Sequence, residues 1–186
     1  MKNHIISGIK LTVICLVFSS GFYTLFILGI AQIIPNQGKG EITEENGKKQ
    51  YLNIGQSFTD PKYFNSRPSA VNYNAAGSGG SNKGPSNPEY LAEVQKRIDT
   101  FLIQNPEIKK REIPTDLVTA SGSGLDPDIS VQAAKVQVKR IAKIRNIEQQ
   151  KLVHLIDENT EAPLLGIFGP EKINVLKLNI ALEKLK

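Results

Sequence analysis

The hydrophobic pattern is dominated by one uncharged apolar run near the start of the chain. Leu11–Ile34 is 24 residues long and contains no Asp, Glu, Lys or Arg. As a helix it would be about 36 Å long, enough to cross a hydrocarbon core of about 30 Å. It also exceeds the roughly 7–15 apolar residues of a cleaved secretory signal. The pattern therefore predicts a retained transmembrane helix over 11–34, with Pro35 at its exit.

The charges on either side of this run bear on its orientation. Two lysines precede the run, and three lysines follow it before residue 50. Acidic residues count for little in the positive-inside rule, so charge alone is nearly balanced. The short N-terminus favours a cytoplasmic start. We therefore expect a cytoplasmic segment at 1–10, a span at 11–34 and an extracytoplasmic domain at 35–186.

After the span, the pattern changes to a short hairpin and a long irregular segment. Asn46-Gly47 is typical of a two-residue hairpin turn, which predicts strands at 41–45 and 49–54. Residues 55–87 then show neither a helical nor a strand period, and they are rich in Gly, Ser, Asn and Pro. Disordered segments are poor in aromatic residues. This one contains several, so we expect an ordered binding loop that is held by its own rings.

Helical periodicity returns after the loop. Ser86 and Glu89 have the spacing of a capping box, and Pro88 suits the first turn, so we expect a helix that runs to Gln104. Its predicted buried face consists of Leu91, Val94, Ile98 and Leu102. The further predicted elements are a strand at 113–120, a Gly-rich turn at 121–127, a helix from Ser130 that buries Ala134, Val138 and Ile141, a helix from Asn146 or Gln149 to Ile156, a loop at 162–170, and a strand leading into a terminal helix at 173–182. This mixture predicts an α/β domain of α+β type behind a single N-terminal transmembrane helix.

Composition leaves little room for catalysis. The chain has 186 residues, a net charge of +5, one Cys and two His. One Cys excludes an internal disulfide, and one Cys with two His excludes a four-ligand Cys/His zinc site. The excess of basic residues is too small to indicate a nucleic-acid partner.

Two short patterns are loosely similar to catalytic motifs. Residues 77–84 are Gly-rich, but a phosphate-binding loop needs Gly-Lys-Ser/Thr at a helix start, and here Lys83 precedes the Gly while Pro85 follows it. Ser81 lies in an imperfect nucleophile elbow. Its only candidate base in the soluble part, His154, is placed on an expected helix. A flexible or tightly turned loop and a solvated helix histidine are the favoured interpretations.

Two sets of charged residues have alternative interpretations. Asp126 and Asp128 either contribute to a cation site or cap the following helix, and the cap is favoured. A basic helix face is either solvated, which is the default, or docks on an acidic subunit or lipid headgroups. This face consists of Lys135, Lys139, Arg140, Lys143 and Lys151.

Three stretches, in order along the chain, carry a more specific resemblance. They are GQSFTDPKYFNSRPSAVNYN…SGGSNKGPSNPEY, TDLVTASGSGLDPDIS and INVLKLNIAL. Together with one N-terminal span followed by a soluble domain, they make the chain closely similar to the C subunit of the Kdp-type potassium-transporting P-type ATPase of bacteria and archaea.

The resemblance implies an accessory, non-catalytic subunit of a high-affinity, ATP-driven potassium uptake pump in the bacterial cell membrane. The implied partners are an ATP-hydrolysing P-type subunit, a channel-like potassium-selecting subunit and a small single-span subunit. The family is described as a catalytic chaperone that raises the ATP affinity of the hydrolysing subunit, with its external domain over the potassium entrance. No metal or cofactor is assigned to this chain. ATP is bound by the complex, and a transient sharing of ATP with this subunit stays open.

These two implied roles conflict physically. ATP is cytoplasmic, whereas a span with a cytoplasmic N-terminus places the soluble domain outside. We therefore expect a structural role, with any effect on ATP affinity transmitted by conformational coupling.

The resemblance also supplies four groups of site residues. We expect the first two groups to face a partner subunit and the last two to hold the fold of the domain. The groups are Phe58, Tyr63, Phe64, Arg67, Pro68 and Ser69; then Ser78, Gly79, Gly80, Ser81, Asn82, Ser86 and Asn87; then Ser121, Gly124, Leu125 and Asp126; and finally Asn174 and Asn179.

Two other functions stay open on the sequence alone. A stand-alone, membrane-anchored extracytoplasmic binding module would leave the membrane without large partners, whereas a pump subunit would leave with them. An anchored serine hydrolase would need Ser81 and a base. If the pump interpretation holds, Arg67→Ala is predicted to impair assembly or transport more than it lowers the stability of the domain.

Overall fold

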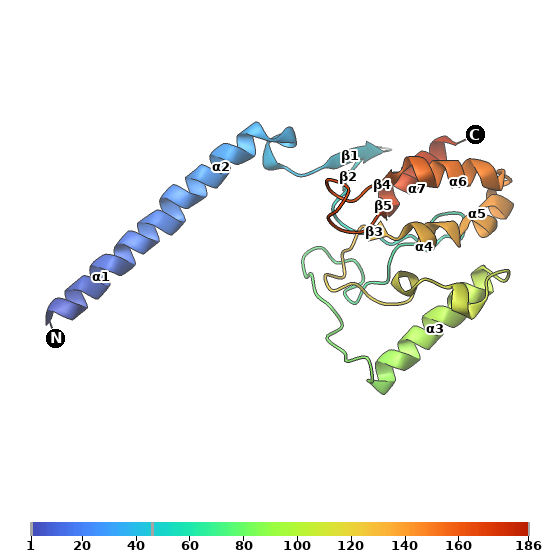
Figure 1. Ribbon diagram of the computed structural model, residues 1–186, viewed down its shortest axis with the longest axis horizontal. Helices are drawn as coiled ribbons and strands as arrows, with labels where there is room; N and C mark the ends of the chain where they lie inside the picture. Colours follow the sequence, from blue (N-terminus) through green and yellow to red (C-terminus); the bar gives the residue numbers. More distant parts are fainter. Residues whose placement is uncertain (1, 46, 186) are drawn as a thin grey trace. The chain divides into compact units, whose positions relative to one another are not determined.

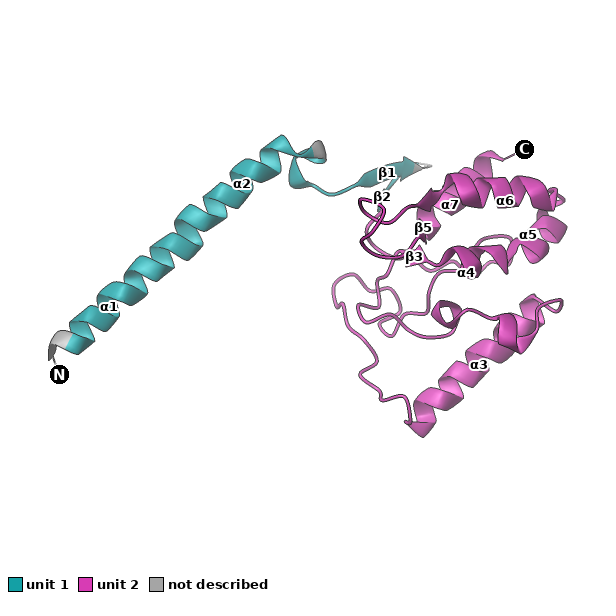
Figure 2. Cartoon of the chain, in the orientation of Figure 1, with its two compact units in different colours: residues 1–51 teal, residues 52–186 magenta. Residues whose placement is uncertain are grey.

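The computed structural model describes residues 2–45 and 47–185, and the chain divides into two compact units. Unit 1 is Met1–Tyr51 and unit 2 is Leu52–Lys186 (Figure 2). The division lies later than the predicted boundary between span and domain, because the predicted hairpin belongs to unit 1.

Unit 1 begins with one long helical segment. It comprises α1 (Lys2–Leu16), a π-helical stretch η1 (Val17–Tyr23) and α2 (Thr24–Ile33) (Figure 1). Within it, His4–Ile33 is 30 residues long and contains an 18-residue stretch with a mean hydropathy of 2.2, so it is long and apolar enough to cross a membrane. The helix therefore starts earlier than the predicted span at 11–34 and ends one residue before it.

The π-helical stretch lies where small and hydroxyl-bearing residues interrupt the apolar sequence. The Ser20 hydroxyl donates to the carbonyl of Leu16, and the Thr24 hydroxyl donates to the carbonyl of Ser19 at 3.2 Å. Side-chain hydroxyls compete in this way with the regular helical hydrogen bonds, and π-turns commonly occur at such places.

A 3-10 turn, η2 (Pro35–Gly38), follows the helix, and a hairpin completes unit 1. Its strands are β1 (Ile42–Glu45) and β2 (Lys48–Tyr51), paired antiparallel with Ile42 opposite Tyr51. The predicted hairpin is confirmed, but its second strand ends at Tyr51 and not at residue 54. The first residue of its predicted turn, Asn46, lies outside the described residues.

Unit 2 combines a small sheet with several helices. The sheet has three short antiparallel strands in the order β3–β5–β4, so the domain is of the mixed α+β type rather than a parallel α/β type. The elements are α3 (Pro88–Gln104), η3 (Lys110–Glu112), η4 (Thr115–Leu117), β3 (Asp128–Ile129), α4 (Val131–Lys135), α5 (Val138–Arg145), α6 (Gln149–Glu158), β4 (Thr160–Glu161), β5 (Lys172–Asn174) and α7 (Val175–Lys184).

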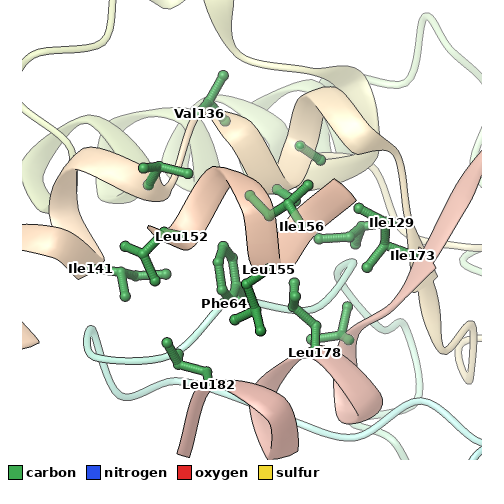
Figure 3. Packing of buried hydrophobic residues seen from close by; sticks show 14 of the residues in the cluster. Phe64, Ile129, Val136, Ile141, Leu152, Leu155, Ile156, Ile173, Leu178 and Leu182 are labelled. Carbon is green, nitrogen blue, oxygen red and sulfur yellow. The ribbon is translucent and has the colours of Figure 1, made fainter. Parts of the chain in front are cut away.

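The core of unit 2 lies between the C-terminal helices, the small sheet and one residue of the long loop. Figure 3 shows the ring of Phe64 surrounded by side chains of α5, α6 and α7. The largest fully buried side chains include Phe64, Ile141, Leu152, Ile156, Ile173, Leu178 and Leu182. The loop is therefore part of the core, which fixes the position of everything beside Phe64.

The predicted strand at 113–120 is wrong. The segment instead forms the 3-10 turn η4, in which the amide of Leu117 donates to the carbonyl of Pro114 at 3.2 Å. The Thr119 hydroxyl also donates to the carbonyl of Thr115 at 2.7 Å. These local bonds replace the ladder that a strand would need.

The first predicted helix is confirmed, but its cap and its burial differ from the prediction. Asn87, and not Ser86, is the N-cap of α3, because its side chain accepts from the amide of Tyr90 at 3.0 Å. Phe101 is the buried residue of this helix, whereas Leu91 is 52% exposed. The rest of the predicted face, Val94, Ile98 and Leu102, is half-buried.

The second predicted helix is divided into α4 and α5. Ser130 caps α4 as predicted, by accepting from the amide of Ala133 at 3.1 Å. Asn146 does not cap α6. It ends α5 in the left-handed conformation, with φ 53°, and Glu148 is the N-cap residue of α6. The predicted loop at 162–170 is confirmed. The predicted strand leading into a terminal helix is also confirmed, as β5 and α7.

Candidate functional site

The candidate site is the long loop at 55–87 together with the Gly-rich turn at 121–127. The described loop has no helix or strand, yet hydrogen bonds join its backbone to the turn at widely separated points. The Gly55 amide donates to the carbonyl of Leu125 at 2.7 Å, and the Gly79 amide donates to the carbonyl of Ser123 at 2.8 Å. The turn also donates to the loop, from the Ser121 amide to the carbonyl of Pro68 at 3.2 Å.

Glycine is required where the loop and the turn approach most closely. A Cβ on Gly55 would lie 2.4 Å from the carbonyl oxygen of Asp126. Gly124 has φ +67°, and a Cβ there would lie 2.6 Å from Cγ2 of Val71 and 2.7 Å from the carbonyl oxygen of Gly79. Both positions therefore exclude larger residues on steric grounds.

An ion pair fastens the middle of the loop to the turn. Nη1 of Arg67 lies 3.0 Å from Oδ2 of Asp126, and the two side chains are 29% and 28% exposed. The Tyr73 hydroxyl donates to the carbonyl of Arg67 at 2.7 Å and holds the same backbone. Arg67 therefore has its principal partner within the domain.

Asp126 serves the turn rather than a cation or a helix start. Its Oδ1 accepts from the amide of Asp128 at 3.1 Å, while Ser130 provides the cap of α4. Asp128 is paired with Lys172 at 2.6 Å. Over residues 2–45 and 47–185, no group of three or more His, Cys, Asp or Glu could hold a metal ion. The favoured cap for Asp126 and Asp128 is thus wrong, and the cation-site alternative gains no support.

Two serines of the predicted docking groups also bond inward. The Ser69 hydroxyl donates to the carbonyl of Gly124 at 2.6 Å and accepts from the amide of Tyr73 at 2.9 Å. The Ser78 hydroxyl donates to the carbonyl of Ser123 at 3.0 Å. Residues from the first and second predicted groups therefore meet the third group at one place.

Arg140 is a buried junction that sequence reasoning missed. Its guanidinium donates to Oδ1 of Asn105 at 3.1 Å, to Oδ1 of Asn65 at 2.7 Å, to Oε1 of Gln137 at 2.6 Å and to the carbonyl of Pro61. The sequence analysis placed Arg140 on the basic helix face. Ile141 and Ala142 follow it directly and are buried, and these apolar neighbours in the sequence were the signal that set it apart from the exposed lysines.

The charge of Arg140 is held by neutral oxygen atoms. Burial lowers the pKa of Arg140 to about 10, while the Asp60 carboxylate acts in the opposite direction. Four oxygen acceptors offset part of the desolvation cost of such a buried charge. Arg140 therefore attaches the loop to α5 through a cation that is largely removed from water. Arg145 of the same helix adds a bond from Nε to the carbonyl of Lys62 at 2.9 Å.

The C-terminal motif holds the long loop at Phe64 and the start of unit 2 at Leu52. The Phe64 amide donates to Oδ1 of Asn179 at 2.9 Å, and Nδ2 of Asn179 donates back to the carbonyl of Phe64 at 3.0 Å. Asn174 caps α7 and donates from Nδ2 to the carbonyl of Leu52 at 2.6 Å. The structural role expected for Asn174 and Asn179 agrees with these contacts. Phe64 is fully buried, so the expectation that its side chain faces a partner is wrong.

The ring of Tyr63 lies in a charged cluster beside Phe58. The guanidinium of Arg145 and the amine of Lys62 lie 5.0 and 5.2 Å from its centroid, and the Phe58 ring lies 5.9 Å away. A hydrogen bond to the Glu183 carboxylate raises the pKa of Tyr63, whereas the hydrogen bond from Arg145 lowers the pKa of Glu183. Both aromatic residues are half-buried and form the outer layer over the core.

The remaining residues of the second predicted group lie nearer the surface. We call this part of the loop the polar edge, and it consists of Ser78, Gly79, Gly80, Ser81, Asn82 and Ser86. Ser78, Asn82 and Ser86 are exposed, and the other three are half-buried. His154 is exposed and pairs with Glu158 at 3.3 Å, which agrees with a solvated helix histidine.

The predicted basic face is partly neutralised within unit 2. Lys135 lies 3.4 Å from Asp157, and Lys139 lies 3.2 Å from Glu107. Since Arg140 points inward, this face is narrower and less positive than the sequence pattern indicated.

Comparison with known proteins assigns the chain to a family. The family model described as KdpC, the c chain of a K+-transporting ATPase, matches residues 5–184. The chain belongs to the KdpC family. The match begins inside α1, so nearly all of the apolar helix, together with the polar edge and the C-terminal motif, lies within the KdpC region.

Individual KdpC relatives agree along their whole length. The potassium-transporting ATPase KdpC subunit of Flavobacterium johnsoniae is 56% identical over 100% of both chains. That of Bacteroides fragilis is 53% identical over 98% of this chain and 97% of the relative. That of Caldanaerobacter subterraneus is 46% identical over 98% of this chain and 95% of the relative. The similarity to KdpC subunits that three motifs indicated thus extends along the full chain. The predicted family is therefore confirmed.

Proposed function

We propose that this protein is a non-catalytic accessory subunit of an ATP-driven potassium uptake pump. One observation carries the proposal: KdpC relatives that are subunits of potassium-transporting ATPases align over the whole chain. The partners would be an ATP-hydrolysing P-type subunit, a channel-like potassium-selecting subunit and a small single-span subunit.

In this proposal, His4–Ile33 is a retained anchor with its N-terminus in the cytoplasm. The length and hydropathy of the helix support a membrane span. Unit 2 would then lie outside the cytoplasm, over the potassium entrance of the channel-like subunit.

The polar edge is the part of the loop that we assign to partner docking. Its exposed residues Asn82 and Ser86 offer amide and hydroxyl groups to a neighbour, while the Ser78 hydroxyl and the Gly79 amide bond to the carbonyl of Ser123 in the turn. A surface that is held in place before binding loses less conformational entropy on association. The many inward bonds of the loop therefore support docking through a prepared surface.

Any effect of this subunit on ATP affinity is assigned to conformational coupling, not to direct nucleotide contact. A helix N-terminus after a Gly-rich loop is a usual place for phosphate. Here the side chain of Asn87 already occupies the amide of Tyr90 at the start of α3, and Pro88 supplies no amide proton. The Gly-rich segment at 77–84 is thus poorly suited to hold a nucleotide.

Sidedness tests this assignment. Protease added to intact spheroplasts should remove unit 2, because an exported domain is accessible from outside the cell. The helix of unit 1 should stay protected by the membrane. A domain on that side has no access to cytoplasmic ATP. Cleavage that occurs only after the membrane is opened would place unit 2 in the cytoplasm and would reverse the argument about ATP.

Arg67→Ala tests the division between docking and folding. The partly exposed Arg67–Asp126 pair is worth about 1 kcal/mol or less, so the melting temperature should change little. Complex yield after affinity purification should fall more strongly, because Arg67 ties the loop to the turn that holds the polar edge. A large melting shift with normal complex yield would refute this, and Lys62→Ala, which removes an exposed pair with Asp60, is the matched control.

Co-purification separates the proposal from a stand-alone membrane-anchored binding module. A pump subunit extracted in mild detergent should migrate with large membrane partners. A chain that migrates alone from a membrane containing the other subunits would favour the binding module.

A further inference from the structure

The loop between β4 and β5 presents an unusual apolar surface in unit 2. We call Leu164–Phe168 the apolar tip. Leu164, Leu165, Ile167 and Phe168 are 70%, 81%, 76% and 59% exposed, respectively. Scattered exposed apolar residues are ordinary, but a contiguous group usually marks a contact surface. Four large exposed apolar side chains within five residues therefore indicate a surface that is covered by another molecule.

The backbone of the apolar tip satisfies much of its own hydrogen bonding. Leu164 and Phe168 exchange two amide–carbonyl hydrogen bonds, each of 3.0 Å. The amide of Gly166 donates to the carbonyl of Pro163 at 2.8 Å, and the amide of Ile167 donates to the carbonyl of Leu164 at 3.3 Å. Polar backbone groups must be paired before a segment can enter an apolar medium at low cost. Within the tip, the amides of Leu164, Gly166, Ile167 and Phe168 all have backbone acceptors, so most of its donors are already paired.

The sequence around the tip contains no charge that would oppose such a transfer. From Ala162 to Pro170 the chain reads APLLGIFGP, and the nearest charged residues are Glu161 and Glu171 on either side. Glu161 is engaged by Lys172 and Lys177 at the base of the loop. An apolar tip with a charged base has the polarity of a segment that lies at a membrane–water interface.

Covalent geometry keeps the entry point of unit 2 near the membrane anchor. Ile33, the end of the apolar helix, is nine residues before Ile42, which limits the separation of these two residues to roughly 30 Å. The hairpin then returns the chain, because Ile42 is paired with Tyr51. Unit 2 begins at the next residue, so its first residue is tethered within a few tens of ångströms of the bilayer.

The apolar tip arises beside this entry point. The carbonyl of Leu52 accepts from Nδ2 of Asn174 at 2.6 Å, and Asn174 ends strand β5. β5 begins at Lys172, two residues after the loop at 162–170 (Figure 1). The strand that leads away from the tip is therefore the strand to which the first residue of unit 2 is bonded. This short tether gives the tip a high effective concentration at the membrane surface.

We propose that the apolar tip inserts into the interfacial layer of the lipid bilayer that holds the anchor of the same chain. The inference rests on the proposed membrane anchor. Leu164, Leu165, Ile167 and Phe168 enter the boundary between headgroups and acyl chains, and the charged base stays in water. The insertion is a second attachment that limits rotation of unit 2 about its tether.

A single tryptophan tests this placement, because the chain contains no Trp. Phe168→Trp is made in the full chain, which is reconstituted in phosphatidylcholine vesicles with or without brominated acyl chains. An interfacial segment lies about 5–10 Å deep, so Trp emission should shift to shorter wavelength and fall roughly twofold in the brominated vesicles. Leu165→Trp provides an independent second reporter, should the first variant fold poorly.

Ile103→Trp is the matched control, because Ile103 is 81% exposed on α3, outside the apolar tip. The expected result is quenching at residue 168 or 165 and no quenching at 103. Equal quenching at all three positions would indicate non-specific adhesion and would overturn the inference. Unquenched, long-wavelength emission from the tip variants in floating vesicles would also overturn it while leaving the anchor intact.

A partner protein is the competing occupant, and the experiment distinguishes it. Tip emission that stays unquenched in vesicles of the chain alone, but shifts when the purified whole complex is reconstituted, would assign the tip to a subunit contact and overturn lipid insertion. A chain that fails to float with vesicles would refute the anchor as well as the inference.

Discussion

The loop at 55–87 and the apolar tip are both irregular, but they relate to the rest of unit 2 in opposite ways. The long loop is polar in composition, yet it contributes the fully buried Phe64 to the core and bonds to Asn179 over a separation of 115 residues. The tip is apolar, yet its four large side chains are exposed, and the backbone hydrogen bonds that hold it join residues 163–168 to one another.

The difference shows that average polarity does not determine whether a loop is buried. What matters is whether distant groups supply partners for the backbone. Arg140, Asn179 and the turn at 121–127 supply such partners to the long loop, Arg140 through the carbonyl of Pro61. The backbone of the tip is bonded within its own loop, without distant parts of the domain. The side chains of the tip therefore stay available to contact another surface.

The largest effect is expected where the long loop depends on one side chain. Arg140→Met should lower the free energy of unfolding by about 3–5 kcal/mol, since it leaves several buried acceptors, including Oδ1 of Asn105 and Asn65, without their donor. Urea unfolding of the full chain in detergent, followed by far-ultraviolet circular dichroism, measures this. Lys139→Met on the same helix is the control and should cost less than about 1 kcal/mol. Equal losses in both variants would contradict the role of Arg140.

The next effect concerns the contact between the long loop and the turn. Gly124→Ala should lower the free energy of unfolding by about 2–3 kcal/mol, because its φ of +67° is unfavourable for Ala and its Cβ would overlap Val71. Gly122→Ala is the matched control, since a Cβ at Gly122 meets nothing within 4 Å. The same denaturation experiment compares them. Similar midpoints for the two variants would show that the loop can move away from the turn without cost.

A smaller effect is expected at the charged cluster on the surface of the long loop. The hydrogen bond from Arg145 lowers the pKa of Glu183, so this carboxylate stabilises the fold above its ordinary unfolded pKa of about 4.3. Its contribution is lost as the pH falls through its lower folded pKa. Glu183→Gln should therefore cost about 1 kcal/mol or less at neutral pH, and the difference from the unmodified chain should vanish in acid. Thermal melts at a series of pH values measure this, and a difference that grows in acid would have the wrong sign.

The smallest effect on stability is expected at the apolar tip. Leu165 is exposed and has φ 55°, a conformation that Asn tolerates better than Leu. Leu165→Asn should therefore change the free energy of unfolding by less than about 0.5 kcal/mol in detergent. Leu182→Asn, at a fully buried position, is the control with a large expected loss. A loss above about 1 kcal/mol at Leu165 would mean that the tip is packed within the domain and not held for another surface.

The sequence alone determined the features that depend on near neighbours along the chain. The apolar helix, the hairpin, the helix from Pro88 to Gln104, the Ser130 cap and the terminal strand and helix follow from periodicity, turn dipeptides and capping residues. The family was also readable, because three motifs in order are enough to identify it. These signals span only a few residues each, so they survive without knowledge of the fold.

Tertiary structure alone decided which side chains face inward. Sequence reasoning placed Phe64 in a docking loop and Arg140 on a basic helix face that was solvated by default, but partners 72–115 residues away bury or bond their neighbourhood. The predicted apolar face of α3 is only partly covered, and the strand expected at 113–120 gave way to a local turn. Burial depends on which distant atoms replace water around a group, and local sequence patterns do not contain that information.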